Sequence, residues 1–357
     1  MNEQLRAGIV GTGIGSLHIA ALQSLTDLFR VQAICDVDEA RAHAVAAQYN
    51  VSHVTTSLQE LCRRDDIDVI HICTPSYLHY EQAIQVLEAG KHVVLEKPVA
   101  GSLGQVDELI QAEAGSGKRV MPIFQYRFGH GAQKLKMLID RGLVGRAYLT
   151  TVETSWRRKP EYYAVPWRGK WRTELGGAIV SQAIHAHDLI YYLLGSVSNV
   201  FARSRTLVNQ IETEDCVSAS LEMSDGSLCS LSVTIGSARE ISRHRFCFRD
   251  LTAESNTEPY TNTADPWTFV GDTPEIQETI DSALKQFQPL PEGFAGQFHR
   301  FFYALKYGTE LPVTLNDSRV SLELITALYE SARTGQAVSL PVSDDHPYYS
   351  GWQPSSE

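Results

Sequence analysis

Apolar and polar residues alternate in blocks over the first third of the chain. Short runs of Val, Ile, Leu and Ala are separated by longer segments in which apolar residues recur every third or fourth position. Continuous short apolar runs are typical of strands buried in a parallel sheet, and the longer segments are typical of amphipathic helices. The pattern predicts strands near 6–10, 31–35, 68–73, 91–95 and 119–124, and helices near 16–25, 38–48, 58–63, 77–89 and 102–115. This βαβ order indicates an α/β domain with helices on both faces of its sheet.

The rhythm changes after Tyr126. A helix near 132–141 precedes strands near 146–156, 197–207, 214–223 and 227–235. Runs of strands of this kind predict an antiparallel or mixed sheet, so we expect the second domain to be α+β.

The end of the chain has a different composition. Residues 252–274 are rich in Thr, Asn, Asp and Pro, which predicts a long loop. A last helix near 317–334 is expected to return to the first domain, and the turn-forming residues after it predict an extended tail. We therefore expect a first domain over 1–125, a second over 126–345 and a tail over 346–357.

The turn after the first predicted strand has the glycine pattern of a phosphate-binding loop. Residues 11–16 read Gly-Thr-Gly-Ile-Gly-Ser. Glycines at a strand-to-helix turn let the backbone approach a pyrophosphate, which the free N–H groups of the helix then stabilise. The next strand ends at Asp36, about 20 residues after the glycines, where a carboxylate can bind the adenosine ribose. These features predict a dinucleotide, and Asp36 favours NAD because it would repel the 2′-phosphate of NADP; Arg41 is the nearby cation that would relieve this repulsion.

Lys97 follows the strand predicted at 91–95. Ligands of an open parallel sheet lie beyond the carboxyl ends of its strands, so Lys97 is expected to face the cofactor. Glu96 lies on the opposite side of the strand and need not neutralise it. Pro98 limits Lys97 to extended conformations. Lys97 is therefore a candidate catalytic group.

Composition narrows the class of partner. A chain of 357 residues with 43% hydrophobic residues can form about two domains with sizeable cores. A net charge of −11 argues against nucleic acid and anionic membranes as partners. The six cysteines lack metal-binding or redox spacing, which favours a reducing, cytoplasmic compartment. The first predicted strand leaves no room for a signal peptide, and no apolar run is long enough to span a bilayer.

Four segments resemble the Gfo/Idh/MocA family, the glucose-fructose oxidoreductase and inositol dehydrogenase group. They are residues 11–18, 73–79, Glu96-Lys97-Pro98 and the glycine-rich segment 176–188. The resemblance implies an N-terminal Rossmann dinucleotide-binding domain and a C-terminal α+β domain with a large open, mainly antiparallel sheet. It also implies a cis Lys97–Pro98 bond and a homodimer or homotetramer formed through the open face of that sheet. The residues that it assigns to NAD are Gly11, Thr12, Gly13, Ile14, Gly15, Asp36, Thr74, Pro75, His79, Glu96, Lys97 and Arg168.

Two positions depart from the family pattern. The third small residue of the fingerprint is either Gly15, one position early, or Ser16, in register. Many members place an aspartate four residues before the catalytic histidine, where this chain has Ser181. A serine carries no negative charge, so any role of that aspartate toward the histidine is lost or moved elsewhere.

The resemblance assigns the catalytic histidine to His185. On one helix His185 and His187 would lie about 200° apart, so only one of them can face the site. Ser181 and Asp188 would share the face of His185. We expect His187 to be structural and no metal to bind, because two histidines at this spacing diverge.

A basic aromatic segment stands out in this acidic chain. Residues 156–172 interleave Arg and Lys with Trp and Tyr. Aromatic faces pack on sugar rings and arginines donate to hydroxyl or anionic groups, so the segment is either a substrate wall or a solvated loop anchored by its aromatics. With the resemblance, the candidate substrate-binding residues are Lys97, Arg127, Tyr163, Arg168, Ser181 and His185.

These features together predict an NAD-dependent oxidoreductase acting on a secondary hydroxyl of a sugar, glycoside or cyclic polyol. Hydride would pass between the substrate carbon and the nicotinamide while Lys97 and His185 handle the hydroxyl proton. Two alternatives stay open. One is an enzyme that retains NAD and uses transient oxidation for glycoside cleavage, elimination or epimerisation, and the other is a non-catalytic NAD-binding sensor.

Overall fold

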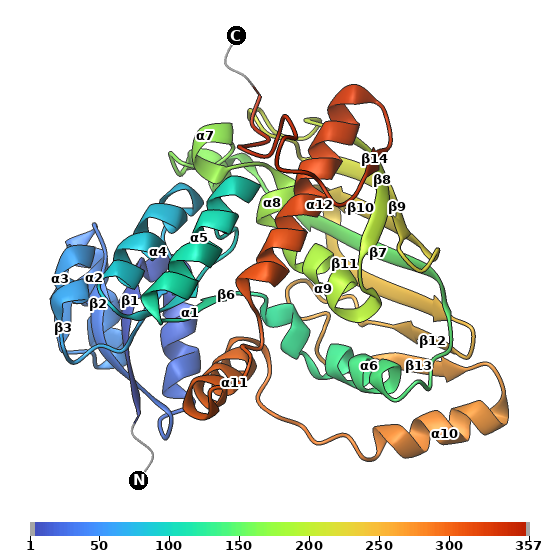
Figure 1. Cartoon of the computed structure of the whole chain (residues 1–357), viewed down its shortest axis with the longest axis horizontal. Helices are drawn as coiled ribbons and strands as arrows, with labels where there is room; N and C mark the ends of the chain where they lie inside the picture. The colour runs from blue at the N-terminus through green and yellow to red at the C-terminus, as the bar shows by residue number, and fades with distance from the viewer. Residues whose placement is uncertain (1–3, 355–357) are drawn as a thin grey trace. The chain divides into compact units, whose positions relative to one another are not determined.

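The computed structural model describes residues 4–354 and contains two compact units (Figure 1). The first unit holds the chain up to Phe124 together with Phe294–Arg319. The second holds Gln125–Gly293 and the chain from Val320 onward. The boundary expected near residue 125 lies at the first crossing between the units, whereas the return of Phe294–Arg319 to the first unit was not predicted.

The first unit is built on a six-stranded sheet in which every neighbouring pair is parallel. Its strand order is β3-β2-β1-β4-β5-β6. The strands are β1 Leu5–Val10, β2 Phe29–Cys35, β3 His53–Thr55, β4 Val69–Ile72, β5 His92–Leu95 and β6 Val120–Pro122. The expected Rossmann sheet is confirmed, and its order reverses between β1 and β4, where open parallel sheets bind their ligands.

Three of the helices between these strands begin at a side-chain cap. Asp38, Ser57 and Ser102 each accept a hydrogen bond from a backbone N–H of the helix that follows. The helices are α1 Thr12–Gln23, α2 Glu39–Tyr49, α3 Leu58–Arg63, α4 His79–Glu88 and α5 Leu103–Ser116, with the 3-10 turn η1 Ser76–Leu78 before α4. The short strand β3 was not predicted.

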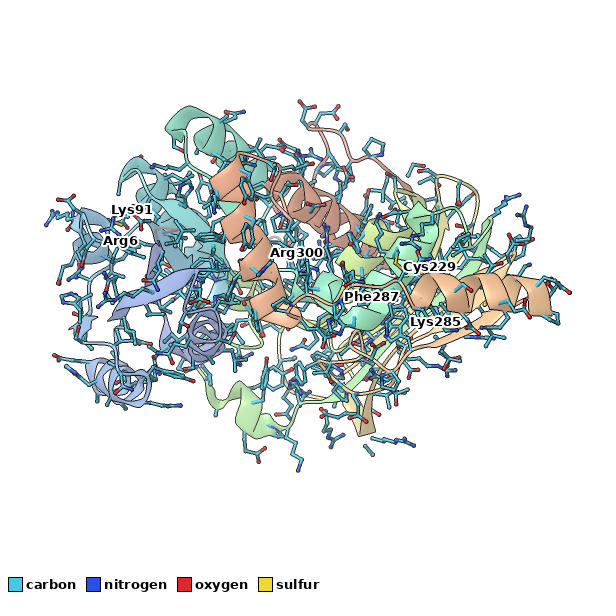
Figure 2. All side chains as sticks on the ribbon, turned by 90° about the horizontal axis from the view of Figure 1, so that it is seen from below. Arg6, Lys91, Cys229, Lys285, Phe287 and Arg300 are labelled. Carbon is cyan, nitrogen blue, oxygen red and sulfur yellow. The ribbon has the colours of Figure 1, made fainter. Side chains whose placement is uncertain are left out.

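Charged side chains close the amino-terminal edge of this sheet. The guanidinium of Arg6 donates to Asp68 at 2.9 and 2.7 Å. The ammonium of Lys91 donates to the carbonyl oxygens of Arg64 and Ile67 at 2.7 and 2.8 Å. Figure 2 shows Arg6 and Lys91 close together in this unit. These groups occupy the amino ends of the strands. A ligand is therefore expected at the carboxyl ends, as in other open parallel sheets.

Helix α11, Gly293–Tyr307, supplies the late segment of the first unit. Gln297 donates to the carbonyl of Pro122 at 2.6 Å and accepts from the amide of Phe124 at 3.2 Å. Arg319 donates to Asp107 of α5 at 2.7 Å. These contacts explain why a segment so late in the chain belongs to the first unit.

The second unit contains an eight-stranded sheet of order β13-β12-β11-β7-β10-β9-β8-β14. Only the β7–β10 pair is parallel, so the mainly antiparallel sheet that we expected is confirmed. Its strands are β7 Ala147–Arg157, β8 Val197–Arg205, β9 Cys216–Met223, β10 Leu228–Thr234, β11 Gly236–Phe248, β12 Leu251–Glu254, β13 Thr268–Gly271 and β14 Val338–Ser339.

Helices cover one side of this sheet. A core joins apolar residues of α6 His130–Asp140 and α9 Ile184–Leu194 to β11, β12 and α10 Pro274–Leu284 (Figure 1). Along β9 and β10 buried and exposed residues alternate, which leaves the other side of those strands exposed. The remaining elements are η2 Gln125–Phe128, η3 Pro160–Ala164, α7 Trp171–Glu174, α8 Ala178–Ser181 and α12 Leu315–Thr334.

Two expectations for this part of the chain were wrong. The loop expected at 252–274 is interrupted by most of β12 and by β13, because these residues extend the edge of the sheet by pairing with β11 and with each other. The expected extended tail is a series of turns over 344–350, and Trp352 is buried with its indole N–H on the carbonyl of Leu175 at 2.6 Å. The last three residues of that tail, 355–357, lie outside the described residues.

No helix within residues 4–354 combines the length and apolarity needed to cross a membrane.

Candidate functional site

The turn between β1 and α1 has three glycines with three different environments. Gly11 has a φ of +86°, and a Cβ there would lie 2.6 Å from the carbonyl oxygen of Cys73. A Cβ at Gly13 would meet no atom within 4 Å, so this side of the turn is open. A Cβ at Gly15 would lie 3.0 Å from Ile9, which places α1 close against the sheet. Gly15 therefore provides the close packing of the third fingerprint position, and Ser16 instead donates its hydroxyl to the carbonyl of Thr12 at 2.6 Å.

Helix α1 starts inside this turn, at Thr12, and not near residue 16 as expected. The N-cap residue, Gly11, supplies no side-chain cap, and the first turn itself contains no acidic residue, although the amide of Thr12 donates to Asp36. The N–H groups that follow Thr12, together with the helix dipole, are thus suited to an anion. The open backbone at Gly13 and this helix terminus fit the pyrophosphate of a dinucleotide.

Asp36, directly after β2, lies at the centre of a hydrogen-bond network. Its carboxylate accepts from the amide and hydroxyl of Thr12 at 2.7 and 2.6 Å and from the guanidinium of Arg41 at 2.6 and 3.2 Å. Burial by itself would raise the pKa of Asp36, but the hydrogen bonds from Arg41 and Thr12 outweigh it and lower the pKa to about 2. Asp36 is therefore a fixed negative charge beside the glycine turn, and Arg41 is its ion-pair partner.

The segment after β4 is tied to the segment after β5. The buried imidazole of His79 contacts the carbonyl oxygens of Thr74 and Pro98 at 2.8 and 2.7 Å. Thr74 donates its hydroxyl to Gln82 at 2.6 Å, and Pro75 precedes the turn η1. Since the His79 ring lies between these two carbonyl groups, it links the segment that contains Thr74 to the segment that contains Lys97 and Pro98. The Lys97–Pro98 bond is cis, as the resemblance implied.

Lys97 lies two residues beyond β5 and is half-buried. Glu96 beside it is buried and accepts from His18 of α1 at 3.1 Å and from the backbone amide of Lys97 at 3.1 Å. The carboxylate of Glu96 thus faces the core, while Lys97 is the residue of this pair at the carboxyl edge of the sheet.

In the second unit, His185 is in the first turn of α9 and is 5% exposed. Its ring stacks on Tyr126 with a centroid separation of 4.9 Å and an angle of 24°. The neighbouring Arg127 makes a two-pronged ion pair with Asp188 at 2.8 and 2.5 Å, and it is itself 5% exposed. This pairing favours a structural role for Arg127 over the expected substrate contact. Tyr126 is a neighbour of His185 that the sequence did not reveal.

The helix that carries His185 is interrupted. The expected single helix is wrong, because the amide of Ala183 bonds to the carbonyl of Ala178, five residues back, and separates α8 from α9. Ser181 and His185 consequently lie on different helices. His187 is fully buried, and burial lowers its pKa to about 3, which supports the structural role expected for it.

Ser181 belongs to a second buried polar network. Its hydroxyl donates to Glu174 at 2.9 Å, and the other oxygen of Glu174 accepts from the amide of Gly169. Arg168 lies 3.5 Å from Glu174, stacks on Tyr162 at 3.8 Å and donates to the Tyr162 hydroxyl. Glu174, 3% exposed, therefore places a buried carboxylate beside Ser181.

The basic aromatic segment is ordered by stacking. Arg158 lies 5.1 Å from the rings of both Trp156 and Tyr162 and pairs with Glu240 at 3.3 Å. Tyr163, half-buried, packs edge-on against Tyr162, and burial raises the pKa of its hydroxyl. Arg158 and Arg168 each have a carboxylate partner, so these two arginines present paired charges beside aromatic faces.

A buried carboxylate supports the glycine-rich segment. Glu214 accepts from the amides of Gly177 and Ile179 at 3.1 and 2.9 Å and from the hydroxyl of Tyr329 at 2.9 Å. A Cβ at Gly177 would lie 1.9 Å from the carbonyl oxygen of Glu214, so glycine is required there. Burial raises the pKa of Glu214 to about 7, although these hydrogen bonds act in the opposite direction.

Within residues 4–354 no group of three or more His, Cys, Asp or Glu side chains is arranged to hold a metal ion.

Comparison with known proteins agrees with both units. Residues 5–124 match an oxidoreductase family with an NAD-binding Rossmann fold, and residues 132–248 match the C-terminal domain of the same GFO/IDH/MocA family. The WlbA dehydrogenase of Bordetella pertussis, solved in complex with NADH and UDP-GlcNAcA, is 31% identical, with a TM-score of 0.83 over 96% of this chain and 100% of its own.

Two relatives extend the comparison. Oxidoreductase YrbE of Bacillus subtilis is 27% identical over 95% of this chain and 98% of its own length. D-glucoside 3-dehydrogenase of Escherichia coli is 32% identical over 57% of this chain and 58% of its own length.

Proposed function

The chain belongs to the GFO/IDH/MocA oxidoreductase family, and from that premise we propose that it is an NAD-dependent dehydrogenase of a secondary hydroxyl on a sugar, glycoside or cyclic polyol. The observation that carries this proposal is Lys97, half-buried at the carboxyl edge of a dinucleotide-binding sheet. The glycine turn, the N-terminus of α1 and Asp36 would hold NAD, which accepts hydride when it is bound.

Lys97 and His185 would manage the hydroxyl proton. We assign His185 as the base that removes the proton and Lys97 as the donor that positions the oxygen and stabilises its negative charge. The reverse assignment uses the same two groups. Stacking on Tyr126 holds the His185 ring in one orientation, which a base acting on a single hydroxyl requires.

The second unit supplies a surface that suits a carbohydrate. The ring of Tyr163, which is half-buried, can pack on the C–H face of a sugar, and the polar groups around Arg168 and Ser181 can bind hydroxyls. The names of the related D-glucoside 3-dehydrogenase and of the WlbA complex with a UDP-sugar point to the same class. Tyr163 and Arg168 stay candidate substrate contacts.

The test is a panel of sugars, glycosides and inositols incubated with NAD, in which NADH and the organic product are both quantified. We expect NADH to accumulate with an equal amount of oxidised product. Product that is cleaved or isomerised without free NADH would show instead a retained-cofactor reaction. If no compound of the panel gives either outcome, the proposal is refuted.

Two variants then test the assigned residues on any substrate found. Lys97→Met and His185→Ala are each expected to lower kcat by roughly 10² to 10⁴, while the dissociation constant for NADH changes little. The two losses should not add, because both groups serve one transition state. Near-normal turnover in both variants would place the chemistry elsewhere.

The assembly is a further part of the proposal. Serine side chains recur on the exposed side of β9 and β10, and Leu228 there is 50% exposed. We propose that a second copy of the chain covers this face, and a monomeric mass in light scattering would refute it. The six free cysteines fit a reducing, cytoplasmic compartment.

A further inference from the structure

Two histidines are fully buried beneath Lys97. His18 comes from α1 and His71 from β4, and both are 0% exposed. Their Nδ1 atoms are 3.1 Å apart, and the other nitrogen of His18, Nε2, is 3.1 Å from Glu96. The rings of Phe294 and Phe298 from α11 pack against His18 at 4.8 and 5.2 Å. Burial of two imidazoles in an apolar core is costly, so the arrangement calls for an explanation.

The hydrogen bonds of this cluster are compatible with one arrangement of neutral rings. Glu96 as a carboxylate can only accept, so the Nε2 atom of His18 must carry a proton. The Nδ1 atom of a neutral His18 is then an acceptor, and the two groups that can donate to it are the Nδ1 atom of His71 at 3.1 Å, the nearer one, and the thiol of Cys73 at 3.5 Å. Burial lowers the pKa of His71 well below its usual value, which agrees with a neutral ring. A continuous chain therefore runs from His71 through His18 to Glu96.

The chain of hydrogen bonds ends on the backbone of Lys97. The amide of Glu96 still bonds to Ile72 in the sheet at 3.0 Å, whereas the amide of Lys97 bonds to the side chain of Glu96 at 3.1 Å. Lys97 is thus held where the sheet ladder stops. On its other side, His79 bonds to the carbonyl of Pro98 at 2.7 Å. The backbone of Lys97 is fixed on both sides by buried polar groups.

We infer that His18 is a positioning residue for Lys97 and acts through Glu96. By donating to Glu96, His18 keeps the carboxylate directed at the amide of Lys97 and so fixes where the Lys97 side chain leaves the sheet. The inference rests on the proposed function only for its kinetic consequence, because the position of the Lys97 backbone can be measured directly.

The direct measurement is the amide signal of Lys97 in protein labelled with ¹⁵N-lysine. An amide bonded to a carboxylate resonates downfield and exchanges slowly with solvent. In His18→Leu we expect an upfield shift and amide exchange faster by roughly 10- to 100-fold, the range for losing a hydrogen bond to a charged group. His18→Gln retains a donor for Glu96 and should restore both values. His92→Leu removes a histidine from the opposite end of β5 and is the matched control, for which neither value should change.

The kinetic measurement separates positioning from a structural role. In His18→Leu we expect kcat to fall by roughly 10- to 100-fold, because small displacements of a catalytic group have effects of this size. The dissociation constant for NADH should stay within about threefold, since the glycine turn and Asp36 are untouched. His71→Phe keeps an aromatic ring in the core and removes the donor to His18, so it should change both the amide signal and kcat in the same direction. It also replaces His18→Leu if that variant does not fold.

The outcomes distinguish the two proposals. If the Lys97 amide is unchanged in both His18→Leu and His71→Phe, the inference is overturned. If the amide shifts but kcat does not, while Lys97→Met loses turnover, His18 does not position the catalytic group and the inference also fails. If Lys97→Met keeps its turnover, the proposed function fails, and the amide signal alone decides whether His18 positions this backbone.

Discussion

Replacing Asp36 with serine is expected to weaken the preference for NAD over NADP. The carboxylate of Asp36 is buried beside the amide of Thr12, at the position where a 2′-phosphate would lie. With its pKa near 2, the side chain is ionised at any pH at which the protein would be assayed. Two unit charges about 5 Å apart at an effective dielectric constant of about 20 repel by roughly 3 kcal/mol, which corresponds to roughly a hundredfold in affinity.

Arg41 affects the expected change in NADPH affinity in two opposite ways. In the wild-type protein its guanidinium lies 2.6 Å from Asp36 and offsets part of the repulsion, so the measured effect of Asp36→Ser should be about 10- to 100-fold. In the variant, Arg41 loses its carboxylate partner and becomes available to the 2′-phosphate. The double variant Asp36→Ser/Arg41→Gln separates these contributions, because it should lose the part of the gain that the released arginine provides.

The assay needs no substrate. Dissociation constants for NADH and NADPH are measured by fluorescence titration at low and at high salt, and their ratio is compared between variants. The ratio should move toward NADPH in Asp36→Ser, and less strongly at high salt, where the charges are screened. If the ratio of the two dissociation constants in Asp36→Ser stays within threefold of the wild-type ratio, Asp36 does not set the cofactor preference. Equal affinity of the wild type for NADH and NADPH would also refute the prediction.

Two further predictions concern stability. The pKa of Glu214 is about 7 in the folded protein, which is above its value in an unfolded chain. Between these two pKa values the folded state holds a proton that the unfolded state has released. The free energy of unfolding should therefore fall as the pH rises from about 4.5 to 7. The loss of stability is about 3 kcal/mol at most. Urea unfolding at pH 5 and pH 8 should show this loss in the wild type but not in Glu214→Gln, which mimics the protonated form. If the variant keeps the same pH dependence of stability, that dependence belongs to other groups. Arg127→Leu removes the ion-pair partner of the buried Asp188 and should lower the free energy of unfolding by about 3 to 5 kcal/mol. The double variant Arg127→Leu/Asp188→Leu should recover much of this loss. Equal urea midpoints in the single and double variants would contradict this account.

The first unit could be predicted well because its signals are local. An apolar run, a glycine turn and a carboxylate after the second strand each depend on a few consecutive residues. Gly15 could not be assigned a role from spacing alone. Its closeness to Ile9 and Cys73 depends on how α1 packs against the sheet, and only the folded chain shows this.

The second unit was harder to predict because its contacts depend on how irregular segments fold and not on runs of consecutive residues. The bond from Ser181 to Glu174 and the stacking of Tyr126 on His185 have no signature in a single sequence. The interruption between α8 and α9 was also invisible, because the segment around Ala183 has good helix-forming residues and tertiary context overrides that preference. Strands β12 and β13 were missed because the Thr, Asn, Asp and Pro content of residues 252–274 is typical of a loop, whereas pairing with β11 and with each other makes these two short segments strands.

Both candidate catalytic groups share one physical feature, which is a buried carboxylate close to each of them in the chain. Glu96 precedes Lys97 and is held by His18, and Asp188 follows His185 by nearly one helical turn and is held by Arg127, whose chain neighbour Tyr126 stacks on His185. A buried carboxylate is costly unless its partners satisfy it, and a satisfied one has few alternative positions. Each unit therefore fixes its own catalytic candidate internally, as a preorganised site requires. It follows that neutralising Glu96 or Asp188 should disturb turnover even though both carboxylates face the core, and that such losses measure positioning and not proton transfer.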